Sequence, residues 1–253
     1  DEKMLVKGTD YGKTQEMAIE NAKDILALGF DPRKTKIMFD LKHMNQDVYN
    51  LAINASSKIT LSTVKAVMGF KDGKNIGSFF YPAIQIAHIL YPTFKRKIPT
   101  VMITAIDQDP FVRLARDVAG RMGLKKPGAL TIKFLPGLSG GAKMSSSDPS
   151  SALYTDDSDA EIERKIKRAF SGGRETLAEH RKYAGNTDID ASFQYLKFFL
   201  EEDDKKLADL EKKYRSGDLM TGELKKYTIS KAKKFFVQHR KNRSKIKIEK
   251  YLI

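Results

Sequence analysis

The segment from Pro136 to Ser151, PGLSGGAKMSSSDPSS, carries the residues of this chain that are best suited to phosphate chemistry. Four glycines or prolines precede Lys143, and three serines follow Met144. An ammonium group in such a segment can stabilise the negative charge that develops on a departing phosphate group. Because glycine and proline favour turns, we expect an exposed and mobile loop.

A phosphate-binding loop of the pattern GxxxxGK[ST] is one alternative for this segment. Aligned on Gly137, the pattern requires glycine at position 142 and serine or threonine at position 144, where the chain has Ala142 and Met144. Such a loop also leads directly into a helix, whereas Asp148 followed by Pro149 favours a turn. The sequence therefore argues against a phosphate-binding loop of this class.

A second group of polar residues lies in AIDQDP, Ala105 to Pro110, between a predicted strand and a predicted helix. Open parallel sheets bind ligands in the crevice at this end of their strands, so Asp107 and Gln108 are candidates for ligand contacts. An aspartate here can equally cap the helix by accepting hydrogen bonds from free backbone N–H groups. For Asp109, which Pro110 follows, we expect the capping role.

Gln85 interrupts the apolar helix that is predicted from Phe79 to Leu90. Burying an amide costs free energy unless the amide forms hydrogen bonds, so Gln85 needs either a ligand or a backbone partner. The residue types alone leave both choices open.

Short apolar runs and helical periodicities predict the elements that position these groups. Three buried strands are expected, at Thr35–Leu41, Ile98–Ile106 and Ala129–Leu135. A helix from Asp109 to Met122 separates the last two strands, so that strand, helix and strand form a βαβ unit. The first part of the chain is therefore predicted to be an α/β domain with a doubly wound parallel sheet.

After Tyr154 the patterns are helical and are separated by glycine and aspartate. The expected helices are Thr155–Phe170, Arg174–Tyr183, Asp190–Leu200, Asp203–Arg215 and Thr221–Arg243. We therefore predict an α/β domain at residues 1–157, followed by an α-helical domain at residues 158–253.

The composition excludes several classes of protein. The chain has no cysteine, and its four histidines show no metal-ligand spacing, so we expect no metal site. No apolar run approaches the roughly 20 residues of a membrane span. The net charge of +14 favours a polyanionic partner such as a nucleic acid.

The positive charge is concentrated near the end of the sequence. Between Lys225 and Lys250, eleven lysines and arginines stand against the single acid Glu249, a local net charge of +10. Apolar residues at helical spacing in this stretch predict an amphipathic helix with a basic outer face: Ile229, Ala232 and Phe236. This face is either a nucleic-acid contact or a solvated surface, and the sequence leaves both open.

KMSSS, Lys143 to Ser147, resembles the KMSKS signature of class I aminoacyl-tRNA synthetases, with Ser146 in place of the second lysine. AIDQDP resembles the AxDQ string of the tyrosine and tryptophan enzymes, and FFYPAIQIAHIL resembles the SFPAIQA segment of the tryptophan enzymes. The resemblance implies tryptophan contacts for Gln85 and Gln108, and catalytic roles for Lys143, Ser145 and Ser147. The ATP-binding residues that it implies are Asp107, Lys143, Met144, Ser145, Ser146 and Ser147.

Two longer strings, Arg168 to Leu207 and Tyr214 to Lys225, resemble the helical anticodon-binding domain of eukaryotic and archaeal tryptophanyl-tRNA synthetases. The resemblance implies activation of tryptophan by ATP, which enters as its Mg²⁺ complex, and transfer to tRNA(Trp). It also implies a homodimer, a cytoplasmic location, a Rossmann-like sheet and no tightly bound cofactor. Contacts with tRNA are expected from carboxylates that meet base edges and from cations that meet phosphates: Asp188, Asp190, Lys241, Arg243 and Lys245.

The family's HIGH-type signature and its indole-contacting residues precede the part that matches Asp1, so we expect this chain by itself to be catalytically incompetent. Its first residues, DEKMLVKGTD, are charged and lack an initial methionine, which suggests an interior start. Two alternatives stay open. A tyrosyl-tRNA synthetase shares KMSSS and the DQ string but not the block from Arg168 to Leu207, and a non-catalytic tRNA-binding fragment shares the basic helical part.

Overall fold

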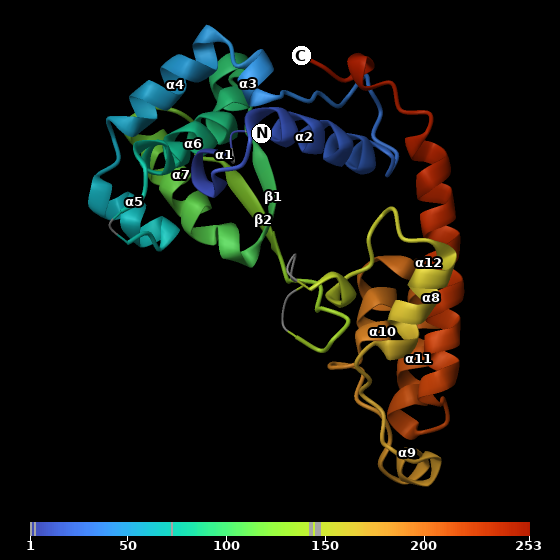
Figure 1. Ribbon diagram of the computed structural model, residues 1–253. Coiled ribbons are helices and arrows are strands. Elements are labelled where there is room, and N and C mark those ends of the chain that lie inside the picture. Colours follow the sequence, from blue (N-terminus) through green and yellow to red (C-terminus); the bar gives the residue numbers. More distant parts are fainter. Residues whose placement is uncertain (1, 3, 72, 142–143, 145–147) are drawn as a thin grey trace. The chain divides into compact units, whose positions relative to one another are not determined.

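The computed structural model describes residues 2, 4–71, 73–141, 144 and 148–253, which form two compact units (Figure 1). The α/β unit comprises residues 1–25, 30–133 and 247–253, and the helical unit comprises residues 26–29 and 134–246. The described residues of the loop from Pro136 to Ser151 therefore belong to the helical unit. The functional boundary after residue 157 stays a prediction.

The α/β unit combines helices of different lengths with one pair of strands. Its elements are α1 (Met4–Lys7), α2 (Tyr11–Leu26), α3 (Asp40–His43), α4 (Gln46–Ser56), α5 (Leu61–Met68), α6 (Ile76–Arg96), β1 (Val101–Ala105), η1 (Ile106–Gln108), α7 (Asp109–Arg121), β2 (Gly128–Ile132) and η4 (Ile248–Lys250). Polar side chains begin three of the helices: Asn45, Thr60 and Asn75 each accept a hydrogen bond from the backbone N–H three residues ahead.

The predicted βαβ unit is confirmed. β1 and β2 form a parallel pair in the register Val101↔Gly128 to Ala105↔Ile132, and α7 connects them. α7 packs its apolar face against α6, where Ile86 and Leu90 meet Ala115 and Val118 in a buried cluster (Figure 1). This packing fixes the end of β1 relative to the middle of α6.

One face of the two-stranded sheet is exposed in this chain. Val101, Ile103, Leu130 and Ile132 keep 64%, 73%, 59% and 54% of their surface exposed, and the register places them on the same face. The expectation of buried strands is therefore wrong for this face. The single crossover helix covers only one side of a parallel sheet, and burial of the other side requires a second layer.

The strand predicted at Thr35–Leu41 is wrong. Ile37 forms only an isolated parallel bridge with Leu252, through the Ile37 N–H to Tyr251 O (2.7 Å) and the Ile253 N–H to Ile37 O (3.2 Å). Apolar runs indicate burial, but a ladder also requires a neighbouring strand of similar length. Among the described residues, the backbone of this stretch pairs outside its own segment only with the last three residues of the sequence.

The helical unit confirms the helices that are predicted after Tyr154. Its elements are η2 (Pro149–Ser151), α8 (Asp159–Arg168), α9 (Leu177–Tyr183), α10 (Ala191–Tyr195), the π-helical turn η3 (Leu196–Leu200), α11 (Asp204–Ser216) and α12 (Thr221–Arg243). Ser158 and Thr176 begin α8 and α9 with capping boxes, in which the side chains of Glu161 and Glu179 bond back to the cap.

The amphipathic pattern predicted for α12 is also confirmed. Its buried stripe recurs at helical spacing and consists of Leu224, Thr228, Ala232, Phe236 and His239. Residues from the other helices complete the core around this stripe, among them Ile162, Ile166, Phe193, Tyr195 and Tyr214. In the part of the chain that the structure describes, no helix is long and apolar enough to cross a membrane.

Candidate functional site

α6 and the end of β1 bring together two glutamines that are 23 positions apart in the chain. Gln85 projects from α6, and its amide nitrogen Nε2 lies 3.4 Å from Oε1 of Gln108. Gln108 ends the turn η1 directly after β1. Both amides thus lie at the carboxyl end of a parallel strand, where such sheets bind ligands. Because the contact is long for a hydrogen bond, both amides retain capacity for a ligand.

The two aspartates beside Gln108 have different surroundings. Asp107 lies in η1 and is exposed. Asp109 opens α7, and its carboxylate accepts from Nε of Arg113 at 2.7 Å. The capping role expected for Asp109 is wrong, since Asp109 is the first residue of α7 and Gln108 holds the N-cap position without a side-chain cap bond. The turn η1 runs directly into the helix, and the N–H of Asp109 bonds to the carbonyl of Ile106.

The structure also groups three titratable side chains that the sequence spacing does not connect. His88 lies one turn after Gln85, with Nε2 2.7 Å from Oδ1 of Asp40 and Nδ1 4.0 Å from Oε1 of Glu2. Burial, reinforced by the neighbouring Asp40, raises the pKa of Glu2. Burial opposes the ionisation of Asp40, but hydrogen bonds from His88 and Glu2 outweigh it and lower the Asp40 pKa. The grouping is therefore a partly buried cluster of titratable side chains.

The loop from Pro136 to Ser151 is closed at its base. The N–H of Leu138 donates to the carbonyl of Ser151 at 2.8 Å, and the Leu138 side chain is only 2% exposed. Asp148 caps η2 by accepting from the N–H of Ser150 at 3.0 Å, which confirms the predicted turn. The expectation of an exposed loop is wrong at Leu138, because this side chain belongs to the helical core. The predicted residues Lys143, Ser145, Ser146 and Ser147 lie outside the described residues.

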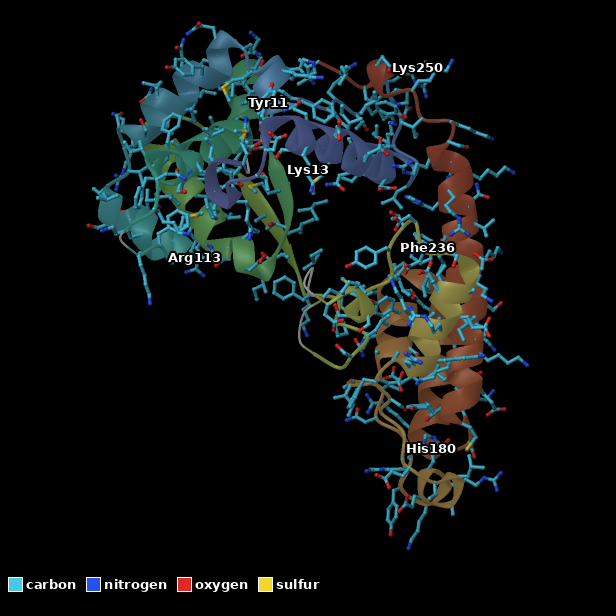
Figure 2. All side chains as sticks on the ribbon, in the orientation of Figure 1. Tyr11, Lys13, Arg113, His180, Phe236 and Lys250 are labelled. Atoms are coloured by element: carbon cyan, nitrogen blue, oxygen red, sulfur yellow. The ribbon has the colours of Figure 1, made fainter. Side chains whose placement is uncertain are left out.

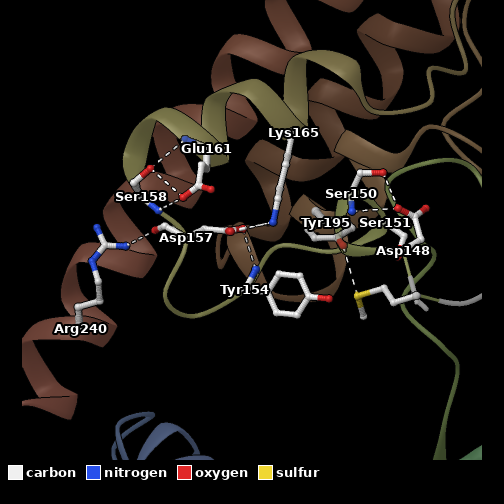
Figure 3. A network of polar contacts seen from close by, with 11 residues as sticks. Asp148, Ser150, Ser151, Tyr154, Asp157, Ser158, Glu161, Lys165, Tyr195 and Arg240 are labelled. Carbon is white, nitrogen blue, oxygen red and sulfur yellow. Dashed lines mark hydrogen bonds and ion pairs between the residues drawn. The ribbon is translucent and has the colours of Figure 1, made fainter. Parts of the chain in front are cut away.

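A buried ion pair fixes the segment that follows the loop (Figure 3). Nζ of Lys165 lies 2.7 Å and 2.6 Å from the two carboxylate oxygens of Asp157, which also accepts from the N–H of Tyr154. Arg240 of α12 donates to the Asp157 carbonyl at 2.9 Å and to the Asp159 carboxylate at 2.7 Å. The segment is thus tied to both α8 and α12.

The two aspartates predicted to contact tRNA differ in exposure. Asp188 is exposed and forms an ion pair with Arg215 at 2.9 Å. Asp190 is completely buried, and its carboxylate accepts from the N–H groups of Gly172 and Phe193 and from the hydroxyl of Tyr214. Burial and the charge of Asp190 raise the pKa of Tyr214 to about 12. The Asp190 carboxylate is therefore engaged inside the unit, whereas Asp188 faces solvent.

α12, the helix that carries Phe236 in Figure 2, has basic residues in different surroundings. Four of them bind acceptors inside the helical unit: Lys225, Lys231, Lys233 and Arg240. Four others on this helix and just after it are exposed: Lys226, Lys234, Lys241 and Lys245. Of the three predicted phosphate contacts, Lys241 and Lys245 are exposed and Arg243 is half-buried. The solvent face of α12 is thus basic, but with less free charge than the sequence count suggests.

Residues 7–237 match the model of the family described as tRNA synthetases class I (W and Y). This chain belongs to that family. The match extends over both units, so the α/β unit and the helical unit are parts of one synthetase architecture.

Individual synthetases of this family resemble the chain along nearly all of its length. It is 43% identical to the tryptophan–tRNA ligase of Sulfolobus acidocaldarius, over 98% of this chain and 65% of that protein. It is 42% identical to the cytoplasmic tryptophan–tRNA ligase of Homo sapiens, over 97% of this chain and 54% of that protein. The solved tryptophanyl-tRNA synthetase of Giardia lamblia superposes with a TM-score of 0.90 at 34% identity, covering all of this chain and 71% of that structure. These likenesses confirm the predicted Rossmann-like α/β fold.

The chain spans about 65% of the Sulfolobus ligase and about half of the human one. Sequence reasoning named Gln85, Asp107 and Gln108 as candidates and did not name His88, and these assignments stay predictions. The spacing of His88, three residues after Gln85 on the same helix, is the available signal, because positions i and i+3 share a helical face.

Proposed function

We propose that this chain is part of a tryptophan–tRNA ligase that activates tryptophan with ATP and transfers it to tRNA(Trp). The observation that supports this best is the similarity to tryptophan ligases over 98% of the chain, at 43% identity. The meeting of Gln85 and Gln108 at the carboxyl end of β1 supports it independently, since an amino-acid substrate needs polar groups at that place. The named relatives are tryptophan enzymes, so a tyrosine enzyme is not favoured.

The proposed chemistry divides the reaction among the residues of two segments. Gln85 and Gln108 hold the amino acid, and Asp107 lies beside the ribose of ATP, which enters as its Mg²⁺ complex. The tryptophan carboxylate attacks the α-phosphorus, a new O–P bond forms, and the bond to pyrophosphate breaks. Lys143 stabilises the charge on the departing pyrophosphate, and Ser145 and Ser147 donate to its oxygens.

We assign tRNA binding to the helical unit. Its net positive solvent face on α12 suits the phosphate backbone, with Lys241, Arg243 and Lys245 as contacts. Asp188, which is exposed, is proposed to accept from base edges. Asp190 is proposed to position the segment that carries Asp188, because its carboxylate bonds to the N–H of Gly172 and the hydroxyl of Tyr214.

A homodimer is part of the same proposal. Most apolar residues of α6 between Phe79 and Leu90 are already buried in the core of the α/β unit, among them Ile84, Ile86 and Leu90. Leu61 of α5 and Ile76 at the start of α6 remain 55% and 86% exposed and are the better interface candidates. Sedimentation of the full-length protein tests this assignment.

The test of the function is pyrophosphate exchange by the full-length protein that contains this chain. Exchange should depend on tryptophan and not on tyrosine. Replacing Lys143 with alanine should slow it roughly 100-fold, equivalent to about 3 kcal/mol, because one preorganised donor to the transition state is lost. Tryptophan affinity should stay unchanged. A parallel loss of tryptophan binding would show that Lys143 does not act selectively in the transition state.

A further inference from the structure

The two ends of the loop from Pro136 to Ser151 pack against the helical unit. Leu138 packs in the apolar cluster that includes Ile162 and Ile166 of α8. The carbonyl of Leu138 also accepts from the N–H of Phe170 at 2.6 Å. A Cβ on Gly140 would lie 2.6 Å from the ring of Phe170, so the chain approaches this ring as closely as a glycine permits. The first part of the loop is therefore fixed on the helical unit.

The second part of the loop is fixed by short polar contacts. Asp148 holds η2 through the backbone and hydroxyl of Ser150, at 3.0 Å and 2.6 Å. Three residues after η2, Tyr154 begins the turn that the buried pair of Asp157 and Lys165 closes. The ammonium group of Lys165 also lies 4.6 Å from the centre of the Tyr154 ring. Both ends of the loop therefore have little freedom to move independently of α8 and α12.

A single described contact reaches from the helices to the middle of the loop. The hydroxyl of Tyr195 in α10 lies 3.6 Å from the sulfur of Met144, which occupies the second position of KMSSS (Figure 3). Tyr195 is only 2% exposed and is surrounded by the same core as Leu138. Burial raises the pKa of Tyr195 to about 12, so the hydroxyl keeps its proton at neutral pH and donates. A thioether is a weak acceptor, which makes this contact weak and reversible.

We propose that Tyr195 is a positioning residue for the loop from Pro136 to Ser151, and that its hydroxyl holds Met144 against the helical unit before ATP binds. This inference rests on the proposed function, because that function makes the loop an ATP-binding segment. Its consequence is that ATP handling depends on a residue of the unit that is proposed to bind tRNA. Tyr195 touches no substrate, and its hydroxyl contacts Met144 and the backbone of Leu153.

The contact itself can be tested without any activity. In the protein labelled with ¹³C at the methionine methyl groups, the Met144 signal, one of nine, is identified by Met144→Leu. Tyr195→Phe keeps the ring in the core and removes only the hydroxyl, so it should shift the Met144 signal and leave the others in place. Tyr227→Phe is the matched control, because that hydroxyl bonds to Glu201 instead. An unmoved Met144 signal in Tyr195→Phe, or an equal shift in the control, overturns the proposal.

The functional consequence is measured in the full-length protein by pyrophosphate exchange. Tyr195→Phe should raise KM for ATP about threefold to fivefold, as expected for one weak hydrogen bond, with kcat and KM for tryptophan unchanged. Met144→Leu removes the acceptor of the contact, so adding Tyr195→Phe to this variant should not raise KM for ATP any further. A fall in kcat at constant KM for ATP, or additive effects, overturns the proposal. If the wild-type protein shows no exchange, the proposed function fails, whereas the Met144 signal still decides whether the contact exists.

Discussion

The two units of this chain bury their apolar residues to different degrees. In the helical unit Phe193, Tyr214 and Leu224 are fully buried. In the α/β unit Ile103 and Leu130 keep 73% and 59% of their surface exposed, although α6 and α7 share a closed cluster. One packed neighbour can bury the apolar stripe of a helix. A parallel sheet has apolar side chains on both faces, so their burial requires a packed layer on each face. Equal substitutions in the two units should therefore have unequal effects.

The largest difference is expected for truncation of an apolar side chain. Leu224→Ala removes a completely buried side chain from α12 and should destabilise the helical unit by about 3–5 kcal/mol, through lost burial and the remaining cavity. Ile103→Ala, on the exposed sheet face, should cost less than about 0.5 kcal/mol. Hydrogen exchange in urea, read separately for α12 and β1, measures both. Similar losses would mean that Ile103 is buried in solution.

The same contrast shows what local sequence patterns can predict. The helices after Tyr154 follow from spacing and from capping residues such as Ser158 and Thr176, all within a few positions of one another. The sequence also predicted β1 and β2. It did not predict their exposure, because the segments that pack against a strand can be distant in the sequence. For the same reason the bridge at Ile37 was mistaken for a strand.

The site follows the same rule. Gln85 and Gln108 could be named from the sequence, since a buried amide and a strand end both indicate a ligand. The ion pairs of α12 could not, because Lys231 and Lys233 meet Glu201 and Glu163, which are 30 and 70 positions away. The cluster of Glu2, Asp40 and His88 was missed for that reason as well. Counting charges along the chain therefore overstates the free positive charge of the helical unit.

The second prediction concerns one of these ion pairs and its dependence on pH. Burial opposes the ionisation of Glu201, but hydrogen bonds from Tyr227 and Lys231 lower its pKa to about 2. Its folded pKa is thus below the unfolded value, so the stabilisation is complete above about pH 4.5 and is lost as the pH falls towards 2. Glu201→Gln should cost about 2 kcal/mol at pH 7, and the difference from wild type should vanish near pH 2.

Chemical denaturation at a series of pH values measures this difference. Glu202→Gln is the control, because Glu202 is the exposed neighbour and has the same chemistry. A pH-independent deficit in Glu201→Gln would contradict the ion-pair explanation and indicate lost packing instead. In the α/β unit the raised pKa of Glu2 has the opposite sign, whereas the lowered pKa of Asp40 has the same sign as that of Glu201.

The third prediction compares cations at the end of α12 with exposed lysines of the α/β unit. Replacing Lys241, Arg243 and Lys245 with glutamine in the full-length protein should weaken tRNA binding about tenfold and lower the salt slope by about two to three. The control replaces three exposed lysines of the α/β unit, Lys13, Lys34 and Lys125, and changes the net charge equally. Binding titrations across a range of salt concentrations distinguish the two variants. Equal losses in both would mean that only the overall charge attracts tRNA.

Tryptophan activation should be unaffected in the variant of Lys241, Arg243 and Lys245. Discrimination between anticodons should also survive, because phosphate contacts position a nucleic acid and base contacts specify it. An unchanged salt slope would show that the basic face of α12 is only a solvated surface.

The smallest effect is expected for glycines that differ in conformation. Gly222 lies in the first turn of α12 with no atom within 4 Å of the position of an added Cβ. Gly222→Ala should therefore stabilise the helical unit by about 0.5 kcal/mol, chiefly because alanine restricts the unfolded chain more than glycine does. In the α/β unit, Gly69 ends α5 with equal free space but a φ of 65°, so Gly69→Ala should destabilise by about 1 kcal/mol. Space is the same at both positions, and only the backbone conformation differs. Denaturation of the two variants thus measures the contribution of backbone conformation to the free energy of unfolding. A loss of stability in Gly222→Ala would mean that α12 does not begin at Thr221 in solution.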